Sequence, residues 1–337
     1  GPVMSTGAQD TLPTTDANRQ VTLEPGGYSR FTGDKVSDRE RLLSLTGVFV
    51  RGLLRGIWRK VMPALALLPA IAIAAYALAR GWATDQAAAA PQGTQGIATA
   101  LGVESAQQTE FLVSNMGILF AILVGWILLW HVGLVAPLIT RDKRHGALLL
   151  YFSRPVRKQH YLWARILSVT FVGAVTLALP SILLLLAHLV AFGFRLGGAP
   201  FGESAWLLWP ALLASTLVAS LLIAALLAVV SLGISAWMRD HTAASLSLAG
   251  VVLASIASSW VMQLIWGRNT LARSVDLHHA LQAPYRFSLM ALDAVESPEF
   301  ATLDAAAGLS IWLALAVLGW LALQRFIDRP PLGRAQS

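Results

Sequence analysis

An all-helical protein that crosses a membrane several times is the fold class that this sequence predicts, and three observations predict it. Of the 337 residues, 56% are hydrophobic and only 13% are charged. The mean hydropathy is +0.62, which is high for a water-soluble chain. The apolar residues also gather into six stretches, each long enough for a helix that spans a lipid bilayer.

These six stretches are the predicted transmembrane helices. A helix needs about 20 apolar residues to cross roughly 30 Å of hydrocarbon. The spans are predicted near residues 61–79, 115–139, 162–191, 206–236, 242–266 and 305–323. None has Asp, Glu or Lys in its central part, where such a charge would cost about 3 kcal/mol on insertion. Pro69, Pro137 and Pro180 are expected to kink the first three spans, either as packing features or as hinges.

The charges of the connecting segments predict the orientation in the membrane. Residues 51–60 hold four basic and no acidic side chains, and residues 141–160 hold six basic and one acidic. By contrast, residues 80–114 hold one Arg against three acids, and residues 267–304 hold three Arg against five acids. Basic segments stay in the cytoplasm, so both termini are predicted there and the two acidic connections outside.

The N-terminal part divides into two predicted segments. Residues 1–37 lack apolar periodicity and are predicted to be a disordered arm, in which residues 1–3 before Met4 are typical of the remnant of a cleaved expression tag. Residues 38–60 predict an amphipathic helix, whose Arg51, Arg55 and Arg59 lie apart from its apolar face. An interfacial helix along the bilayer is favoured over a solvated one. The transmembrane domain is then 61–323, and 324–337 is a cytoplasmic tail.

The motifs of common enzymes are missing. There is no phosphate-binding GxxxxGK[ST], no HExxH and no GxSxG, and no acidic pair lies inside a span. The absence of cysteine excludes thiolate metal sites and cysteine nucleophiles. The basic residues lie beside apolar spans, which favours membrane lipid over nucleic acid as their partner. We therefore predict a non-catalytic membrane subunit with no metal site and no cofactor of its own.

Three polar side chains within the spans are candidates for a substrate path. They are His131, His188 and Gln263. Ionisable and polar side chains are expensive inside a membrane and often mark such a path. A hydrogen bond within the helix bundle is the alternative explanation, and it is the favoured one for all three.

The loop between the second and third spans is unusual for a simple connection. Gly146 breaks the helix, residues 147–152 are predicted to form a short apolar helix, and Arg154 before Pro155 ends it. Burial of one large apolar side chain is worth about 2 kcal/mol, so such a helix is expected to be covered. A protein partner is favoured over dipping into the membrane surface.

The run PLITRDKRHGALLLYFSRPVRKQHYLWARIL resembles the cytoplasmic loop of permease subunits of ABC-2 type transporters, in the NosY-like and gliding-motility subgroup. Gly146, Pro155 and Arg157 match the subgroup pattern, and Asp142 with Lys143 approximates its charged pair. The chain departs from that pattern at two positions, with Ala147 for the usual Thr and Leu149 for a frequent acid. The six-span layout and the amphipathic lead-in helix extend the resemblance over most of the chain.

The resemblance implies a subunit that works with a separate ATPase, expected in two copies, which binds ATP and Mg. A second permease subunit is also implied, with a homodimer favoured, in the inner membrane of a bacterium. The coupling helix that fits the ATPase is implied to comprise Gly146, Leu148, Leu149, Leu150 and Phe152, with Arg144, Arg154 and Arg157 on acidic groups. Arg51, Arg55 and Arg59 fall in the family's connecting helix, which also contacts the ATPase.

Two alternatives to a transport permease stay open. A mechanotransmission subunit of the same build would drive a periplasmic accessory protein, seated on the outer connection at 80–114, without passing a small molecule. A membrane enzyme or a standalone scaffold is the second alternative. The cargo of a permease stays open among lipid, peptide, polysaccharide and drug-like molecules, whereas the lack of acidic residues in the spans disfavours bare metal ions.

Overall fold

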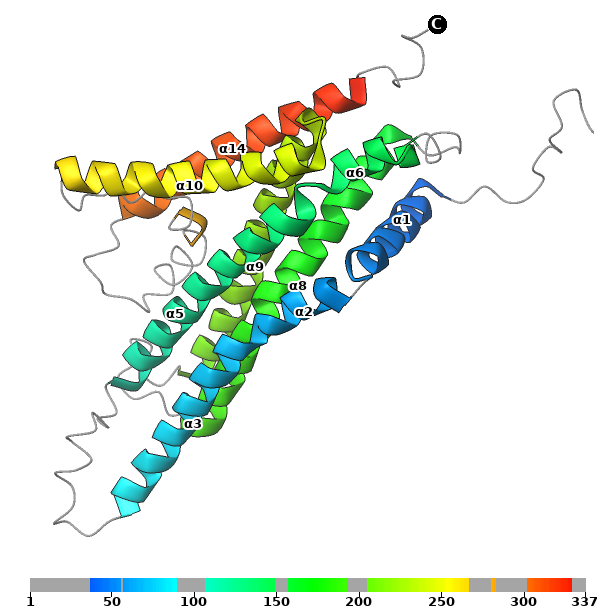
Figure 1. Cartoon of the computed structure of the whole chain (residues 1–337). Helices are drawn as coiled ribbons and strands as arrows, with labels where there is room; N and C mark the ends of the chain where they lie inside the picture. The colour runs from blue at the N-terminus through cyan, green and yellow to red at the C-terminus, as the bar shows by residue number, and fades with distance from the viewer. Residues whose placement is uncertain are drawn as a thin grey trace, which may run out of the picture. The chain divides into compact units, whose positions relative to one another are not determined.

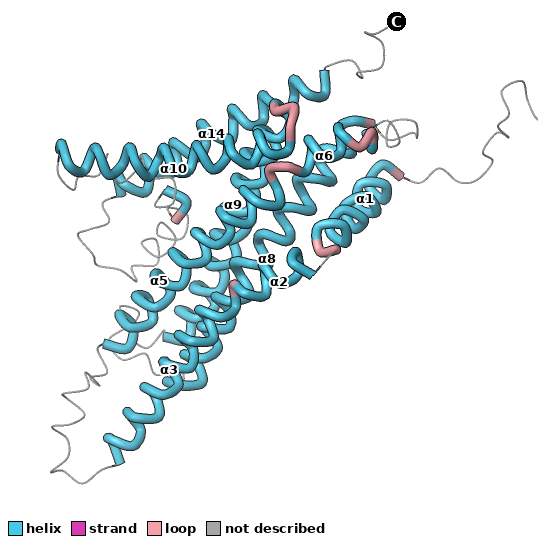
Figure 2. The backbone as a smooth tube through the Cα atoms, in the orientation of Figure 1, coloured by secondary structure: helices cyan, strands magenta, loops and turns pink. Residues whose placement is uncertain are grey.

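The computed structural model of the chain describes residues 37–55, 57–89, 107–148, 157–192, 205–266, 280–282 and 302–328. These residues are helical with short turns, and no strand occurs among them (Figures 1 and 2). The chain divides into two compact units, Gly1–Asp38 and Arg39–Ser337. Almost all of the first unit, including the predicted disordered arm up to residue 36, lies outside the described residues. The helices below belong to the second unit, apart from the first residue of α1.

The predicted amphipathic helix over 38–60 is divided in the structure. Helix α1 spans Asp38–Leu53 and α2 spans Ile57–Leu65, so the prediction of one continuous helix was wrong. The sequence has glycine at positions 52 and 56, and glycine is among the poorest helix formers. The chain turns after Leu53, where the Arg55 N–H donates to the Gly52 carbonyl at 3.3 Å.

The first predicted span contains a similar break. Helix α3, Leu67–Ala89, follows α2 after a turn at Ala66. Pro69 lacks the N–H that would donate to the Leu65 carbonyl, so the break lies one turn before the proline. The apolar section that is long enough to cross a membrane runs over Pro63–Ala83.

The second span is made of three helical pieces. Helix α5, Gln107–Trp130, continues as a π-helix, η2, over His131–Val135, and α6 follows over Leu138–Arg144. The Ala136 N–H donates to the His131 carbonyl at 2.8 Å, which is the wide spacing of a π-helix. Pro137 then stands at the turn before α6. The predicted interruption at Pro137 is confirmed, and it extends over a longer segment than the proline alone.

The remaining spans are long single helices. Helices α8 (Lys158–Phe192), α9 (Ala205–Trp237) and α10 (His241–Trp266) match the third, fourth and fifth predictions. Helix α8 continues through Pro180. Among the described residues, five helical stretches are long and apolar enough to cross a membrane. The sixth predicted span lies in α14, Thr302–Asp328, whose described apolar section, Leu313–Phe326, is shorter than a full crossing, so a sixth crossing stays a prediction.

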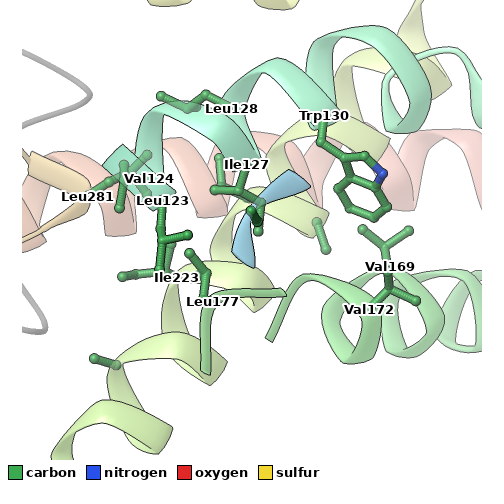
Figure 3. Packing of buried hydrophobic residues seen from close by; sticks show 14 of the residues in the cluster. Leu123, Val124, Ile127, Leu128, Trp130, Val169, Val172, Leu177, Ile223 and Leu281 are labelled. Atoms are coloured by element: carbon green, nitrogen blue, oxygen red, sulfur yellow. The ribbon is translucent and has the colours of Figure 1, made fainter. Parts of the chain in front are cut away.

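Helices α8 and α9 form the centre of the packed core. Helix α8 contacts α3 and α5 as well as α9, and α14 packs on α9 (Figure 1). Figure 3 shows the interior between α5, α8 and α9, where Ile127, Leu177 and Ile223 are fully buried. A Cβ on Gly173 of α8 would lie 3.1 Å from the Ala224 Cβ of α9. Small residues therefore let these helices approach closely.

Candidate functional site

The ends of several helices meet around α6, and a buried polar cluster lies at this junction. The Tyr161 hydroxyl, from the first turn of α8, donates to Asp142 Oδ2 on α6 at 2.5 Å. Arg165, one turn further along α8, forms an ion pair with the same carboxylate oxygen. The side chains of Arg165 and Asp142 are only 9% and 17% exposed. We call these three residues, together with Phe49, the Asp142 cluster.

Phe49 brings helix α1 into this cluster. The Arg165 guanidinium lies over the Phe49 ring at 3.9 Å from its centroid. The Tyr161 ring meets Phe49 edge to face, with centroids 5.6 Å apart and an interplanar angle of 85°. Cation–π and edge-to-face contacts each contribute about 1 kcal/mol, and burial of the ring adds more. The buried guanidinium is thus covered by α1 on one side and paired with α6 on the other.

The apolar side of α1 packs against the Asp142 cluster. Leu42 and Leu45 pack against the group formed by Phe49, Tyr161 and Ala164. The predicted amphipathic pattern is confirmed for this helix, because its residues at helical spacing do share one face. That face packs on the chain itself. Leu148, the last described residue before the loop, packs against the same group, so α1, α8 and the start of the loop share one contact area.

Helix α6 is also attached to the end of α9 and contacts α14. Lys143 Nζ donates to the Ala236 carbonyl at 2.5 Å and to the Met238 carbonyl at 3.4 Å. The same ammonium lies 5.0 Å from the Phe326 ring centroid of α14. Successive residues of α6 therefore bond to different helices, with Asp142 bonded to α8 and Lys143 to the end of α9.

The predicted coupling helix is described only at its beginning. Gly146 has a φ of +64°, a left-handed conformation that suits glycine and ends α6. Arg144 and Arg157 are exposed on the two sides of the loop, and Arg144 Nη1 lies 3.4 Å from His241 Nδ1. Four other predicted residues lie outside the described residues, namely Leu149, Leu150, Phe152 and Arg154.

The basic residues of the predicted connecting helix fall on both sides of the break between α1 and α2. Arg51 lies in the last turn of α1 and Arg55 just after it, and both are exposed. Arg59 lies in α2, but its side chain is outside what the structure describes. Two of the three cations thus point away from the apolar face that packs on the Asp142 cluster.

The three candidate substrate-path residues lie on separate helices. His131 of η2 is fully buried and donates through Nδ1 to the Ile127 carbonyl at 2.8 Å. His188 of α8 donates to the Leu184 carbonyl at 3.0 Å, and Gln263 of α10 donates to the Ser259 hydroxyl at 3.0 Å. Each of these three bonds stays within one helical turn. The alternative explanation, a bond within the helix, describes all three contacts.

Sequence reasoning assigned no role to Phe49, Tyr161 or Ser235. A signal for part of the cluster was present, because Asp142 is the one acid in a strongly basic run and Tyr161 and Arg165 lie one helical turn apart. No pattern in the sequence indicated that the Ser235 hydroxyl accepts hydrogen bonds from the backbone N–H groups of Thr140 and Ile139, which lie 95 and 96 positions earlier in the chain.

The described residues contain no group of three or more His, Asp or Glu side chains that could hold a metal ion. The sequence matches no protein-family model and no curated protein. By helix length and hydropathy the chain is a multi-pass helical membrane protein. Any narrower assignment has to come from the residues around α6.

Proposed function

We propose that the chain is a permease subunit of a bacterial ABC transporter of the ABC-2 type, which couples ATP hydrolysis on a separate subunit to movement of a substrate across the inner membrane. The observation that carries the proposal is the shared contact area of α1, the start of α8 and Leu148 around the Asp142 cluster. The loop joins α6 to α8, and a buried ion pair also holds these two helices together, so a displacement of the loop would pass to both helices.

The exposed charges near the loop support a docking role. Arg51, Arg55, Arg144 and Arg157 are exposed on segments that converge on the Asp142 cluster. A partner with acidic groups on its surface would be attracted to these cations, and its apolar cleft would cover the Leu-Leu-Leu-Tyr-Phe segment of the loop. In this proposal the partner binds the nucleotide and Mg, and the chain supplies the path together with a second permease subunit.

Co-purification tests the proposal directly. The chain is purified together with the products of its neighbouring genes, among which the proposal requires an ATPase subunit, and Leu149 and Phe152 are replaced by Asp in the test variant. The two carboxylates would have to enter an apolar cleft, so the ATPase should be lost from the purified complex while the chain stays in the membrane fraction. The matched control is Gln159→Asp, which adds an acid at an exposed position just after the loop. Equal recovery of the ATPase with both variants would contradict the docking role of the loop.

Charge reversal tests the cations separately. Arg157→Glu, and the triple change of Arg51, Arg55 and Arg59 to Glu, should weaken the complex, because like charges would then face the acidic partner. The effect should grow as the salt concentration falls. Unchanged ATPase binding at low salt would remove these residues from the docking surface, and full transport activity would remove the connecting-helix assignment.

A further inference from the structure

A serine hydroxyl of helix α9 accepts hydrogen bonds from the first turn of helix α6. The Ile139 and Thr140 N–H groups donate to the Ser235 hydroxyl at 3.0 and 3.2 Å. The first N–H groups of a helix have no partner within it, and a serine oxygen is among the groups that best satisfy them. The residue at the cap position of α6 is Pro137, which makes no side-chain cap. A hydroxyl from another helix, fully buried at 0% exposure, takes that role.

A lysine of α6 in turn donates hydrogen bonds to backbone carbonyls at the end of α9. The last carbonyls of a helix are unsatisfied, and a cation is favoured near them because the helix dipole is negative at that end. Lys143 Nζ donates to Ala236, in the last turn of α9, at 2.5 Å and to Met238, just after that helix, at 3.4 Å. Ser235 and Ala236 are adjacent, so the two exchanges occur within one helical turn of α9. We call this pair of exchanges the reciprocal cap.

The connection from α6 back to its own span is interrupted by a proline. Between α5 and α6 lie η2 and the turn at Ala136 and Pro137. Pro137 has no N–H, so the backbone ladder that would join α6 to η2 is interrupted there. A π-helical turn followed by a proline is a common place for a helix to bend. Through its Ser235 and Lys143 bonds, α6 is thus attached to a helix about 95 residues away in sequence.

The attachment extends to α14. Helices α9 and α14 touch through their backbones, since a Cβ on Gly233 would lie 2.6 Å from the Gly319 Cα. Lys143 adds its contact with the Phe326 ring of α14. A displacement of α6 would therefore displace α9 and α14 together.

We propose that Ser235 and Lys143 are positioning residues that fix α6 to α9. Movement of the loop after α6 then passes to α9 and α14, while η2 and Pro137 form a hinge that leaves α5 behind. The reciprocal cap is a property of the chain alone. The direction of force transmission rests on the proposed function, because it requires a partner that moves the loop.

Hydrogen exchange on the purified chain in lipid nanodiscs tests the cap without any partner. Ser235→Ala should speed the exchange of the Ile139 and Thr140 amides about fivefold, which corresponds to loss of one ordinary hydrogen bond. Ser231→Ala is the matched control, because Ser231 is also fully buried on α9 but bonds only to carbonyls of its own helix. Ser235→Thr keeps the hydroxyl and should restore slow exchange. Equal exchange in Ser235→Ala and Ser231→Ala would overturn the cap.

Spin-label distances in the complex with the ATPase test the transmission. The chain has no cysteine, so two introduced cysteines label cleanly. The pair Arg141→Cys with Trp237→Cys reports on α6 and α9, and the pair Arg141→Cys with Leu129→Cys reports on α6 and α5. Between the nucleotide-free and the vanadate-trapped ATP states, the first distance should stay constant and the second should change. The opposite result, with α6 following α5, would overturn the proposal.

Two variants separate positioning from a merely structural role. Lys143→Met should broaden the distribution of α6–α9 distances and make that distance change between the two nucleotide states, whereas Lys143→Arg should restore the narrow and constant distance. Lys60→Met removes an exposed cation of α2 and should leave that distance unchanged. If no ATPase binds the chain, the proposed function fails and the exchange experiment still decides the cap. If the ATPase binds and α9 does not follow α6, the transmission fails and the permease assignment stands.

Discussion

Replacing Asp142 by Asn keeps the shape of the side chain and removes the charge that pairs with Arg165. Loss of one partner from a buried ion pair costs about 3–5 kcal/mol, because the other charge is left without compensation. Both side chains are less than one-fifth exposed, so solvent screens them little. Arg165 keeps its contact with the Phe49 ring, which places the expected cost at the lower end, about 3 kcal/mol.

A double-mutant cycle measures this pair. Asp142→Asn, Arg165→Gln and the combination are unfolded in mixed micelles with rising SDS, and tryptophan fluorescence follows the transition. Each single change should lower the free energy of unfolding by about 3 kcal/mol. The combination should cost no more than the worse single change, because it leaves no unpaired charge, so the coupling energy is about 3 kcal/mol or more.

The control for the cycle is Arg157→Gln. Arg157 precedes α8 by one residue and is exposed, so its loss should change the free energy of unfolding by less than about 0.5 kcal/mol. Additive effects of the two cluster changes would refute the reasoning, since they would mean that Asp142 and Arg165 stabilise the protein independently. A stable Asp142→Asn variant would refute it as well.

Four further outcomes are expected from the same structure. Tyr161→Phe removes a donor to a carboxylate and should lower the free energy of unfolding by about 1.5–3 kcal/mol in the same assay. Phe49→Ala should release α1 and speed tryptic cleavage after Arg51 and Arg55, whereas Leu43→Ala, at a 58% exposed position of the same helix, should not. Gly319→Val would place a Cβ 2.9 Å from the Val229 carbonyl oxygen, and this overpacking should cost about 1–3 kcal/mol or more and lower the melting temperature. Gly250→Ala is the control, because a Cβ at position 250 would have nothing within 4 Å, and the melting temperature should stay unchanged or rise. Gly146→Ala should destabilise the end of α6 by about 1 kcal/mol, because a φ of +64° is strained for alanine, and faster amide exchange over 141–146 would report it.

The positions of the long helices could be predicted from the sequence because membrane insertion depends on local hydrophobicity. Helices α8, α9 and α10 lie where the apolar stretches predicted them, within a few residues. The interruption before α6 was also local, since Pro137 lacks an N–H wherever the rest of the chain lies. The division of α1 from α2 was missed, although the glycines at 52 and 56 were visible, because the apolar pattern continues across them.

Pairing between distant segments could not be predicted in this way. The resemblance presented Asp142 with Lys143 as a charged pair and Arg144 as a docking cation, and the sequence indicated no partner within the chain for any of the three. The structure directs them to different partners, with Asp142 bonded to Arg165, Lys143 to carbonyls at the end of α9, and Arg144 near His241. Likewise, the histidines that were candidates for a substrate path prove to donate to carbonyls of their own helices.

The sequence by itself determined that the chain is helical, that it is apolar enough to cross a membrane, and that its basic residues lie in segments beside the apolar spans. These properties follow from composition and from spacing along one helix, which are local quantities. Only the tertiary structure decided that Phe49 covers Arg165 and that Ser235 and Lys143 join α6 to α9. Such contacts link residues up to 116 positions apart, and they exist because buried charges and helix ends must find partners once water is removed.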